Sequence, residues 1–589
     1  MPLVGGKKQV IQSAPEQSLE PILGSSVIVI QPGSLNLYIG RATDTLPVCV
    51  PHCIARRHKR PGEQKRHEDA WLMRKECLNT DTEDIHTEGV RSAEDMIQVR
   101  PMSNGEYRQP TVPYEMAELN SEFDCDISNE KSNISWTKTQ FDPALIVGNE
   151  ALHMDPSEPY DLHWPIRHGR LHLHRGPSGS LSSVLKDLED IWGWVIRYKL
   201  DVPLKDLKFY RAILLIPDIY NRQHIREMFD ILLTRLGFSA AFMLQESVCG
   251  TFGTGASSAC VVDVGDQKTS ICCVEDGISQ TNTRLTMDFG GSDITRCFHW
   301  LLLRCGFPYK ECSLADRMDA LFLQELKETY CHMDQDLCGR HGLHMNLNRP
   351  GEPVVKYTMY AGDERLLAPL GVFHPEMFGL AGEQLCHKVE MKISDPADPF
   401  DDDYLKQTMS RHEQAARAIA ARKRENAEKA TADQSMVEDA DLDDEDTVDP
   451  SEPTDPSQPK RQEESLNTMD LSLIGIDQAI LQSIERCEND DMKRRMYSCV
   501  MVIGGGLMFP GLHGWLQHLL WTQMPAAMRL SIESMDIITK TKDLDPQVIC
   551  WKGAAVVSLM DTTHELWITQ SEWTQLGVRI LREKAMFIW

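Results

Sequence analysis

The sequence predicts an α/β fold in which mixed sheets are covered by helices, and three observations point to it. A strand–turn–strand pattern occurs twice, first over residues 27–40 and again over residues 259–275. A glycine-rich turn, residues 504–506, directly follows an apolar run that is typical of a buried strand. Strands and helices alternate over residues 181–237, an order that is typical of sheets with helices on their faces.

The first 24 residues are polar and aperiodic, which predicts a disordered tail. The start of the chain lacks an apolar signal segment, and no run approaches the roughly 18 apolar residues that cross a bilayer. We therefore expect a soluble, intracellular protein without membrane contact. The 17 cysteines lie mostly in apolar runs, which favours reduced core thiols. Cys49 and Cys53 lack a second pair at zinc spacing, so we expect no metal there.

The first hairpin runs from Val27 through Gln31-Pro32-Gly33-Ser34 to Gly40. After it, six of the eleven residues from Arg56 to Arg66 are Lys or Arg. This basic patch is a nuclear import signal, a phosphate contact or a solvated loop, and the sequence leaves the three open. Residues from about 60 to 140 are polar with little periodicity, which predicts a partly disordered insertion.

Four histidines lie between His163 and His174, but no carboxylate or cysteine set goes with them, so a structural role is favoured over a metal site. Apolar residues at spacings of three and four predict a helix over 181–199 that begins at Ser182 or Ser183. An apolar strand follows over 212–216. A second helix then ends at Gly237.

The second hairpin carries Asp263-Val264-Gly265-Asp266 at its turn. Glycine lets the backbone come close to a ligand, so amide groups there can point at a phosphate, and the two aspartates can hold a cation through water. An ordinary hairpin with a solvent-facing acidic turn is the alternative.

Beyond this hairpin the pattern predicts a helix after Gly290-Gly291-Ser292-Asp293, a helix over 316–335, and a helix over 477–487 capped by Asp477. A second insertion spans about 386–470, with a helical stretch at 404–430. Glu438 to Asp455 holds ten carboxylates, over a third of the formal net charge of −27. Such a tract competes for histone tails or merely solvates the chain.

Two phosphate-facing hairpins and one glycine-rich nucleoside turn form a pattern that resembles the ATPase fold of actin, sugar kinases and heat-shock chaperones. The chain resembles the actin family more specifically in Leu145 to Ala151, Trp164 to Gly169, Gly504 to Gly511 and Trp551 to Gly553. Further segments resemble the nuclear actin-related proteins of INO-eighty-type chromatin remodelling complexes: residues 40–47, 264–270 and 587–589. The resemblance covers most of residues 25–385 and 471–589.

The resemblance implies an actin-like ATPase fold, with two lobes around a nucleotide cleft and two large insertions. The smaller lobe is expected from residues 25–252 and 549–589, with the insertion at about 60–140. The larger lobe is expected from residues 253–548, with the insertion at about 386–470. Residues 1–24 stay outside both lobes.

The resemblance also implies ATP or ADP with Mg²⁺ as the ligand of the cleft. Asp263 would hold the nucleotide-bound cation through water, and Gln245 would position the attacking water without acting as a strong base. The residues expected to contact the nucleotide come from both hairpins, one helix and the glycine turn: Gly33, Ser34, Leu35, Asp263, Val264, Gly265, Asp266, Lys327, Glu328, Gly504, Gly505, Gly506 and Met508. For Lys327 and Glu328 an exposed helical ion pair is the alternative.

Several positions depart from the family pattern. Tyr38 stands where actin has a phosphate-binding lysine, and its loss removes a point charge from the β- and γ-phosphate region. Gln31, Leu35, Ser270 and Gln547 replace an acid, a glycine, a histidine and a lysine, respectively. We therefore expect ATP to be a structural ligand that is hydrolysed slowly or not at all. The insertions also predict a monomer that does not polymerise.

As function, the resemblance implies a nuclear scaffold subunit of an INO-eighty-type remodeller with roles in transcription, DNA repair and recombination. Its expected partners are actin and actin-related protein 4 among the remodeller subunits, together with core histones and linker DNA. An active actin-like ATPase or a sugar-kinase-type phosphotransferase is the alternative. The latter needs a catalytic carboxylate facing a substrate hydroxyl, and the sequence offers no matching motif.

Overall fold

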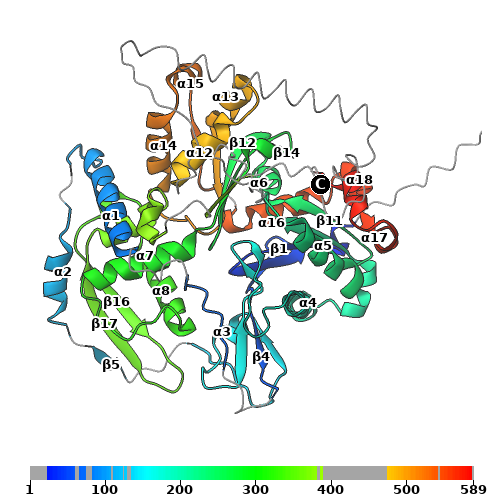
Figure 1. Ribbon diagram of the computed structural model, residues 1–589, viewed down its shortest axis with the longest axis horizontal. Helices are drawn as coiled ribbons and strands as arrows, with labels where there is room; N and C mark the ends of the chain where they lie inside the picture. The colour runs from blue at the N-terminus through cyan, green and yellow to red at the C-terminus, as the bar shows by residue number, and fades with distance from the viewer. Residues whose placement is uncertain are drawn as a thin grey trace, which may run out of the picture. The chain divides into compact units, whose positions relative to one another are not determined.

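The computed structural model confirms the α/β class: two mixed sheets carry the turns that the sequence singles out, and helices cover them (Figure 1). The structure describes residues 23–59, 66–74, 82–107, 110–123, 125–128, 134–380, 385–388, 474–541 and 544–586. The acidic tract, the stretch at 404–430 and the N-terminal tail lie outside these residues. No described helix combines the length and the apolar character that crossing a membrane requires.

The first sheet contains the first hairpin. Its strand order is β21 (Ile568–Thr569), β11 (Ala240–Gln245), β10 (Arg211–Ile216), β1 (Val27–Pro32), β2 (Asn36–Arg41) and β3 (Val48–Pro51). Side chains alternate between the two faces of β1, as they must in a strand. Ile28 and Ile30 pack against α4 (Leu181–Tyr198) and α5 (Arg222–Asp230), while Val27 and Val29 pack toward α16 (Ile549–Val557).

The second sheet contains the central hairpin. Its order is β18 (Cys386–Lys388), β15 (Leu285–Met287), β13 (Thr269–Glu275), β12 (Ser258–Val264), β19 (Cys499–Ile503) and β20 (Asp536–Ile538), with β14 (Ile278–Ser279) on β13. Strand β19 runs parallel to β12, and Ile503 lies opposite Asp263. The glycine turn that follows β19 therefore emerges beside the hairpin turn that follows β12.

Helices α6 (Glu246–Thr254) and α16 pack against each other, and their residues share one core cluster with both sheets. Glycines allow this close approach. A Cβ atom on Gly253 would lie 2.3 Å from the carbonyl oxygen of Ile549, and one on Gly553 would lie 1.8 Å from that of Cys249. Trp551, in the same helix, donates its indole N–H to the carbonyl of Val29 in β1 at 3.2 Å.

The first insertion contains more regular structure than the sequence suggests. Helices α1 (Thr82–Val99) and α2 (Pro113–Asn120) and strand β5 (Asp126–Ser128) lie in it. Buried side chains of α1 recur at spacings of three and four, at Val90, Ala93 and Ile97, and the helix packs against residues 375–378. The low periodicity of the sequence did not reveal this helix, because packing against a distant segment stabilises a helix whose own sequence is largely polar.

Smaller sheets complete the described chain. Strand β5 pairs with β17 (Val354–Ala361), which pairs with β16 (His341–Leu347). Strands β6 (Leu145–Val147), β4 (Ile54–Arg57) and β7 (Tyr160–His163) form another sheet, and β8 (Ile166–Arg167) and β9 (Arg170–Leu171) a hairpin. The other helices are α3 (Asn149–Leu152), α7 (Gly291–Arg304), α8 (Arg317–Tyr330), α9 (Glu364–Leu370), α12 (Ile476–Glu485), α13 (Asp490–Ser498), α14 (Leu512–Gln523), α15 (Ala526–Ser531), α17 (Gln570–Leu576) and α18 (Leu581–Lys584).

Two predicted helix starts are corrected. The N-cap of α4 is Ser180, whose hydroxyl accepts the amide N–H of Ser183 at 3.3 Å, so neither Ser182 nor Ser183 begins the helix. Gly475 precedes α12, and Asp477 lies inside its first turn, where its carboxylate accepts from Gln523 at 2.8 Å. The end of the second helix is confirmed: Gly237 has a φ of +78°, a conformation that glycine adopts without strain.

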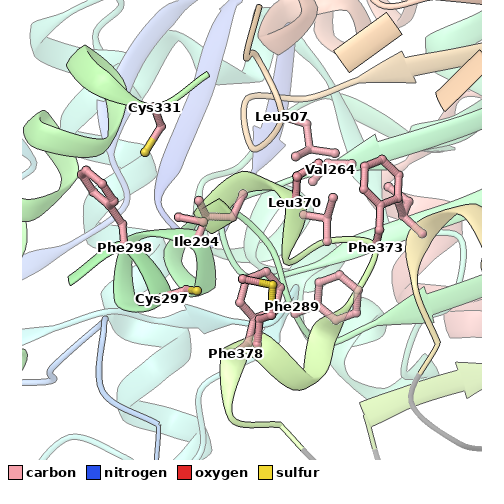
Figure 2. Close-up of a cluster of buried hydrophobic side chains, with 14 of the residues drawn as sticks. Val264, Phe289, Ile294, Cys297, Phe298, Cys331, Leu370, Phe373, Phe378 and Leu507 are labelled. Atoms are coloured by element: carbon pink, nitrogen blue, oxygen red, sulfur yellow. The ribbon is translucent and has the colours of Figure 1, made fainter. Parts of the chain in front are cut away.

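The largest core cluster lies beneath the turns of the second sheet. Figure 2 shows Val264 and Leu507 close together in it, above Phe289, Ile294 and Phe378. Val264 belongs to the turn of the central hairpin and Leu507 follows the glycine turn, and both side chains are at most 4% exposed. Their burial seats the two turns side by side.

Candidate functional site

A cleft lies where the three predicted turns meet. Its walls come from the first hairpin turn, the central hairpin turn, the glycine turn after β19, and the faces of α7 and α8. Of the residues expected to contact a nucleotide, those on the cleft wall are Gly33, Ser34, Leu35, Asp263, Gly265, Asp266, Lys327, Glu328 and Gly504 to Gly506. Val264 points into the core instead, and Met508 does not border the cleft.

The turn of the first hairpin is held by backbone and side-chain hydrogen bonds. Gly33 donates its N–H to the carbonyl of Asn36 at 2.9 Å, and a Cβ at Gly33 would lie only 2.5 Å from that oxygen. His52 lies behind the turn. Its Nε2 accepts from the indole of Trp192, so its Nδ1 carries the proton and donates to the carbonyl of Gly33 at 2.8 Å. Burial lowers the pKa of His52 to about 4, which keeps the ring neutral.

The central hairpin turn repeats this geometry, with the N–H of Gly265 bonded to the carbonyl of Lys268 at 2.8 Å. The other glycine segments pack on it. Gly291 donates to the carbonyl of Gly265 at 3.0 Å, and Gly506 donates to that of Val264 at 2.7 Å. A Cβ at Gly506 would lie 2.3 Å from the carbonyl oxygen of Gly265. The three segments fit together because their glycines lack side chains.

A turn between β8 and β9 connects the two hairpins. Gly169 donates its N–H to the hydroxyl of Ser34 at 3.0 Å. His168 bonds to the backbone carbonyl of Gln267 through Nδ1 at 2.7 Å, and its N–H reaches the Gln267 side chain at 3.2 Å. His168 and Gly169 both have positive φ, at +49° and +70°, so this turn is tight.

The two aspartates of the central turn are placed to respond to a cation. Removal from bulk solvent raises the pKa of Asp266 to about 7, opposed by the ammonium of Lys327. The same effect, followed by repulsion from Glu246, raises the pKa of Asp263. The Oδ2 atom of Asp266 is buried without a hydrogen-bond partner. An orphaned carboxylate oxygen in the same cleft as a second carboxylate fits a hydrated divalent cation, which takes oxygen ligands.

Lys268 and Glu246 form an ion pair in the cleft wall that the sequence did not predict. The Nζ of Lys268 lies 2.6 Å from the Oε2 of Glu246, and both side chains are about one-tenth exposed. Lys268 stands at the start of an apolar returning strand, where a lysine is unusual. That position was the available signal. Its partner comes from another strand–helix junction and could not be identified from spacing.

Gln245 does not border the cleft. It is the last residue of β11, its side chain is buried, and its Oε1 accepts from Arg284 at 3.4 Å. The neighbouring Glu246 is the one that reaches the cleft wall. The structure therefore does not bring Gln245 to the surface where a water would be positioned, and its role stays a prediction.

Two departures from the family pattern contact each other at the edge of the cleft. The hydroxyl of Tyr38 donates to Oε1 of Gln547 at 2.7 Å. The amide of Gln547 in turn donates to the sulfur of Met508 at 3.2 Å. Burial raises the pKa of the Tyr38 phenol well above its usual value, so this group stays neutral. The place of a phosphate-binding lysine is thus taken by an uncharged, internally bonded side chain.

Lys327 and Glu328 do not form an exposed helical ion pair, which is the alternative interpretation of the sequence. Lys327 is buried, and its Nζ donates to the carbonyl of Gly291 at 3.1 Å. Glu328 is exposed and accepts from Gln324, one helical turn earlier, at 2.8 Å. Both residues border the cleft from α8.

Three arginines of the basic patch are bonded within the protein. Arg56 binds Asp187 and Asp190, the latter at 2.8 Å, and Arg57 binds Asp142 at 3.1 Å. Arg66 donates to the carbonyl of Pro156 and pairs with Glu68. Residues 60–65 lie outside the described residues.

Comparisons with known proteins agree with this geometry. The actin family model matches residues 22–388 and 434–586. Actin-related protein 8 of Bos taurus is 45% identical over 96% of this chain and 93% of its own length. That of Aedes aegypti is 40% identical over 98% and 99%, respectively. A solved structure, "Human actin-related protein Arp8 in its ATP-bound state", is 42% identical with a TM-score of 0.82, covering 98% of this chain and all of the other. The chain thus belongs to the actin family, within its actin-related protein 8 branch.

Proposed function

We propose that the cleft binds ATP, or ADP, with Mg²⁺ as a structural ligand and turns it over slowly or not at all. The observation that carries this proposal is the meeting of three glycine turns around two carboxylates in one cleft. Backbone amides at such turns bind phosphate. The structure of the human relative is titled as ATP-bound, which supports the same ligand here.

In this proposal the phosphates contact Gly33 and Ser34 on one side and Gly265 on the other. Asp263 and Asp266 hold the cation through water, and Gly504 to Gly506 with Lys327 enclose the nucleoside. The bound cation supplies charge neutralisation for the phosphates. The chain's own contribution is a set of turns that internal hydrogen bonds already hold in place, so they need little rearrangement to accept an anion.

We expect slow turnover because neither a lysine charge from the first hairpin nor the amide of Gln245 is directed at the terminal phosphate. Tyr38 is neutral and bonded to Gln547, and Gln245 lies behind the cleft wall. Removing one positioned donor or charge from a reacting phosphate typically costs a factor of about 10² or more in rate. We expect both changes to act together.

As scaffold, we propose a nuclear, non-polymerising subunit of an INO-eighty-type remodeller, with roles in transcription, DNA repair and recombination. Membership of the actin-related protein 8 branch supports this role. Actin and actin-related protein 4, core histones and linker DNA are the proposed partners. Arg56 and Arg57 are already paired, so we place any DNA contact elsewhere on the chain.

The nucleotide is tested on the purified full-length chain. Denaturation should release about one ATP or ADP per chain, and a single-turnover assay should show hydrolysis far slower than that of actin. Gly506→Ala, which places a Cβ against the carbonyl of Gly265, should lose the nucleotide. A chain that purifies empty and melts at an unchanged temperature with Mg²⁺ and ATP would contradict binding, and actin-like single-turnover hydrolysis would contradict the structural role.

The scaffold is tested separately. Binding to linker DNA and to core histones is measured against salt concentration, because a phosphate contact weakens as salt rises. We expect salt-dependent binding and no sedimenting filaments at high protein concentration. Filament formation, or absence of binding at low salt, would contradict the scaffold proposal without affecting the nucleotide proposal.

A further inference from the structure

A cluster of histidines surrounds one buried aspartate away from the nucleotide cleft. The prediction that no carboxylate accompanies the histidines of residues 163–174 is wrong, because Asp69 of the insertion lies among them. His67 lies 2.9 Å from its Oδ1, and His163 and His172 lie 3.7 and 3.6 Å from its Oδ2. His174 lies 3.7 Å from Oδ1. Residues nearly a hundred positions apart thus share one carboxylate.

Two sets of three have donor atoms within 4.8 Å of one another: His67, Asp69 and His163, and Asp69, His172 and His174. A zinc ion with nitrogen and oxygen ligands at about 2.0–2.1 Å in tetrahedral geometry holds those ligand atoms about 3.3 Å apart. The Nε2 of His67 lies 2.9 Å from one oxygen of Asp69, and the Nδ1 of His163 lies 3.7 Å from the other, so small shifts of these side chains would bring the three ligand atoms to that spacing.

Hydrogen bonds decide which histidines have a nitrogen lone pair for a metal. The Nδ1 of His174 accepts from the N–H of Gly176 at 3.0 Å, so its Nε2, which faces Asp69, carries the proton. The Nδ1 of His172 faces two acceptors, Asp69 and the carbonyl of Trp164 at 3.2 Å, so it is protonated as well. These two rings are donors toward the carboxylate. The Nε2 of His67 also donates to Oδ1 of Asp69, at 2.9 Å, so His67 binds a metal only by releasing that proton, whereas His163 has no such bond to give up.

His163 differs from them. Its side chain is 3% exposed, and neither ring nitrogen has a hydrogen-bond partner in the structure. A buried imidazole without partners is costly, and a metal bond removes that cost. His67 stacks against it with ring centroids 5.7 Å apart and remains about one-quarter exposed, which leaves a path for an ion and a water ligand.

We propose that His67, Asp69 and His163 bind one Zn²⁺, with water as the fourth ligand. His172 and His174 hold the carboxylate from the outside, as second-layer partners of metal ligands commonly do. Imidazole and carboxylate donors suit zinc, and a binding site with three protein ligands leaves one position open.

The ion would stabilise the segment of residues 67–74, which runs from the histidine cluster to the cleft wall. Residues 67–69 lie along β7, with the N–H of Asp69 bonded to Leu162 at 3.0 Å. The segment continues to Trp71, whose carbonyl accepts from Gln267 of the central turn at 3.4 Å, and to Arg74, which pairs with Asp293 at 3.0 Å. Zinc at one end therefore stabilises contacts of the central hairpin at the other.

The test uses the full-length chain stripped with a chelator and then titrated with Zn²⁺, or with Co²⁺ for its visible spectrum. We expect one tight ion per chain with a tetrahedral cobalt spectrum, a higher melting temperature, and slower hydrogen exchange over residues 66–74. His67→Ala, at a partly exposed position, should lose the ion while the chain stays folded. Asp69→Asn should lose it too, but Asp69 also accepts from Trp164, so folding is checked by circular dichroism.

Controls separate this site from other ligands. His172→Gln should keep the ion with affinity about 10–100-fold weaker, as second-layer changes do. His344→Ala, at an exposed histidine in β16, should bind zinc as the wild type does. Equal zinc binding by wild type and His67→Ala would overturn the proposal, as would a melting temperature that neither zinc nor chelator changes.

Discussion

The ion pair between Lys268 and Glu246 allows a quantitative test of how the cleft wall is built. Both side chains are about one-tenth exposed, and their charged atoms are 2.6 Å apart. Removing one partner of a buried pair leaves the other charge uncompensated, which costs about 3–5 kcal/mol. Lys268→Met keeps the aliphatic stem and removes only the ammonium. We expect it to lower the free energy of unfolding by about 3–5 kcal/mol.

The double variant Lys268→Met/Glu246→Leu should recover most of that loss. Lys268 and Glu246 also act in opposite directions on the pKa of Asp263, so removing both leaves that carboxylate's surroundings nearly balanced. Replacing a whole buried pair by apolar side chains is often neutral. We therefore expect the double variant to lie within about 1 kcal/mol of wild type.

The measurement is urea unfolding of the nucleotide-free chain, followed by tryptophan fluorescence. Lys493→Met is the matched control, because Lys493 pairs with the more exposed Glu485 at 2.9 Å and should cost less than about 1 kcal/mol. The reasoning fails if Lys268→Met unfolds at the same urea concentration as wild type. It also fails if the double variant is as unstable as Lys268→Met alone.

Three further predictions concern the cleft and the insertion. Because the pKa of Asp266 is raised to about 7, its carboxylate loses its charge as pH falls. Calorimetry should therefore show the affinity for Mg²⁺–ATP dropping about tenfold from pH 8 to 6. The Asp266→Asn variant should show little dependence of this affinity on pH. The same raised pKa makes the empty chain less stable as pH rises from about 4 toward 7, which thermal melts at constant salt would show. Gly89→Ala should destabilise the packing of α1, because the added Cβ would lie 2.5 Å from the backbone nitrogen of Met377. Gly193→Ala in α4 is the control and should be tolerated, because its Cβ would lie 3.6 Å from the nearest atom. Hydrogen exchange of α1 measures the difference.

The hairpins and helices with strong local patterns could be predicted from the sequence. Turn chemistry is local, so Gly33 and Gly265 mark their turns without knowledge of the rest of the fold. The same holds for α5 and the π-helical turn Ile231–Arg235 after it, which are followed by Gly237. Helix α1 was missed because its buried residues, such as Val90 and Ile97, are few among polar ones, and a segment nearly three hundred residues away completes its packing.

The parts of the sites that the sequence could not supply are partnerships between distant residues. Asp69 meets His163 across ninety-four positions, and Tyr38 meets Gln547 across more than five hundred. In the sequence alone, Asp69 is an acidic residue in a loop and Tyr38 is an aromatic residue in a strand, and neither indicates a site. Only the tertiary fold shows that these residues complete a cluster or fill a vacated position. The family pattern places Gln245 at the reaction. In the structure its side chain accepts a hydrogen bond from Arg284, and its role stays a prediction.

The side chains that could move when the terminal phosphate is lost already bond to other residues of this protein. Lys268 forms an ion pair with Glu246, the hydroxyl of Tyr38 donates to Gln547, and His168 is hydrogen-bonded to Gln267. In a cleft built for turnover, such groups would be free to rearrange between nucleotide states. Because these bonds join residues of the protein to one another, the proposed nucleotide adds contacts to a wall that does not depend on its hydrolysis. Loss of the γ-phosphate should therefore leave the connected segment from His67 to Arg74 in place, and hydrogen exchange over that segment should be equal with ATP and with ADP.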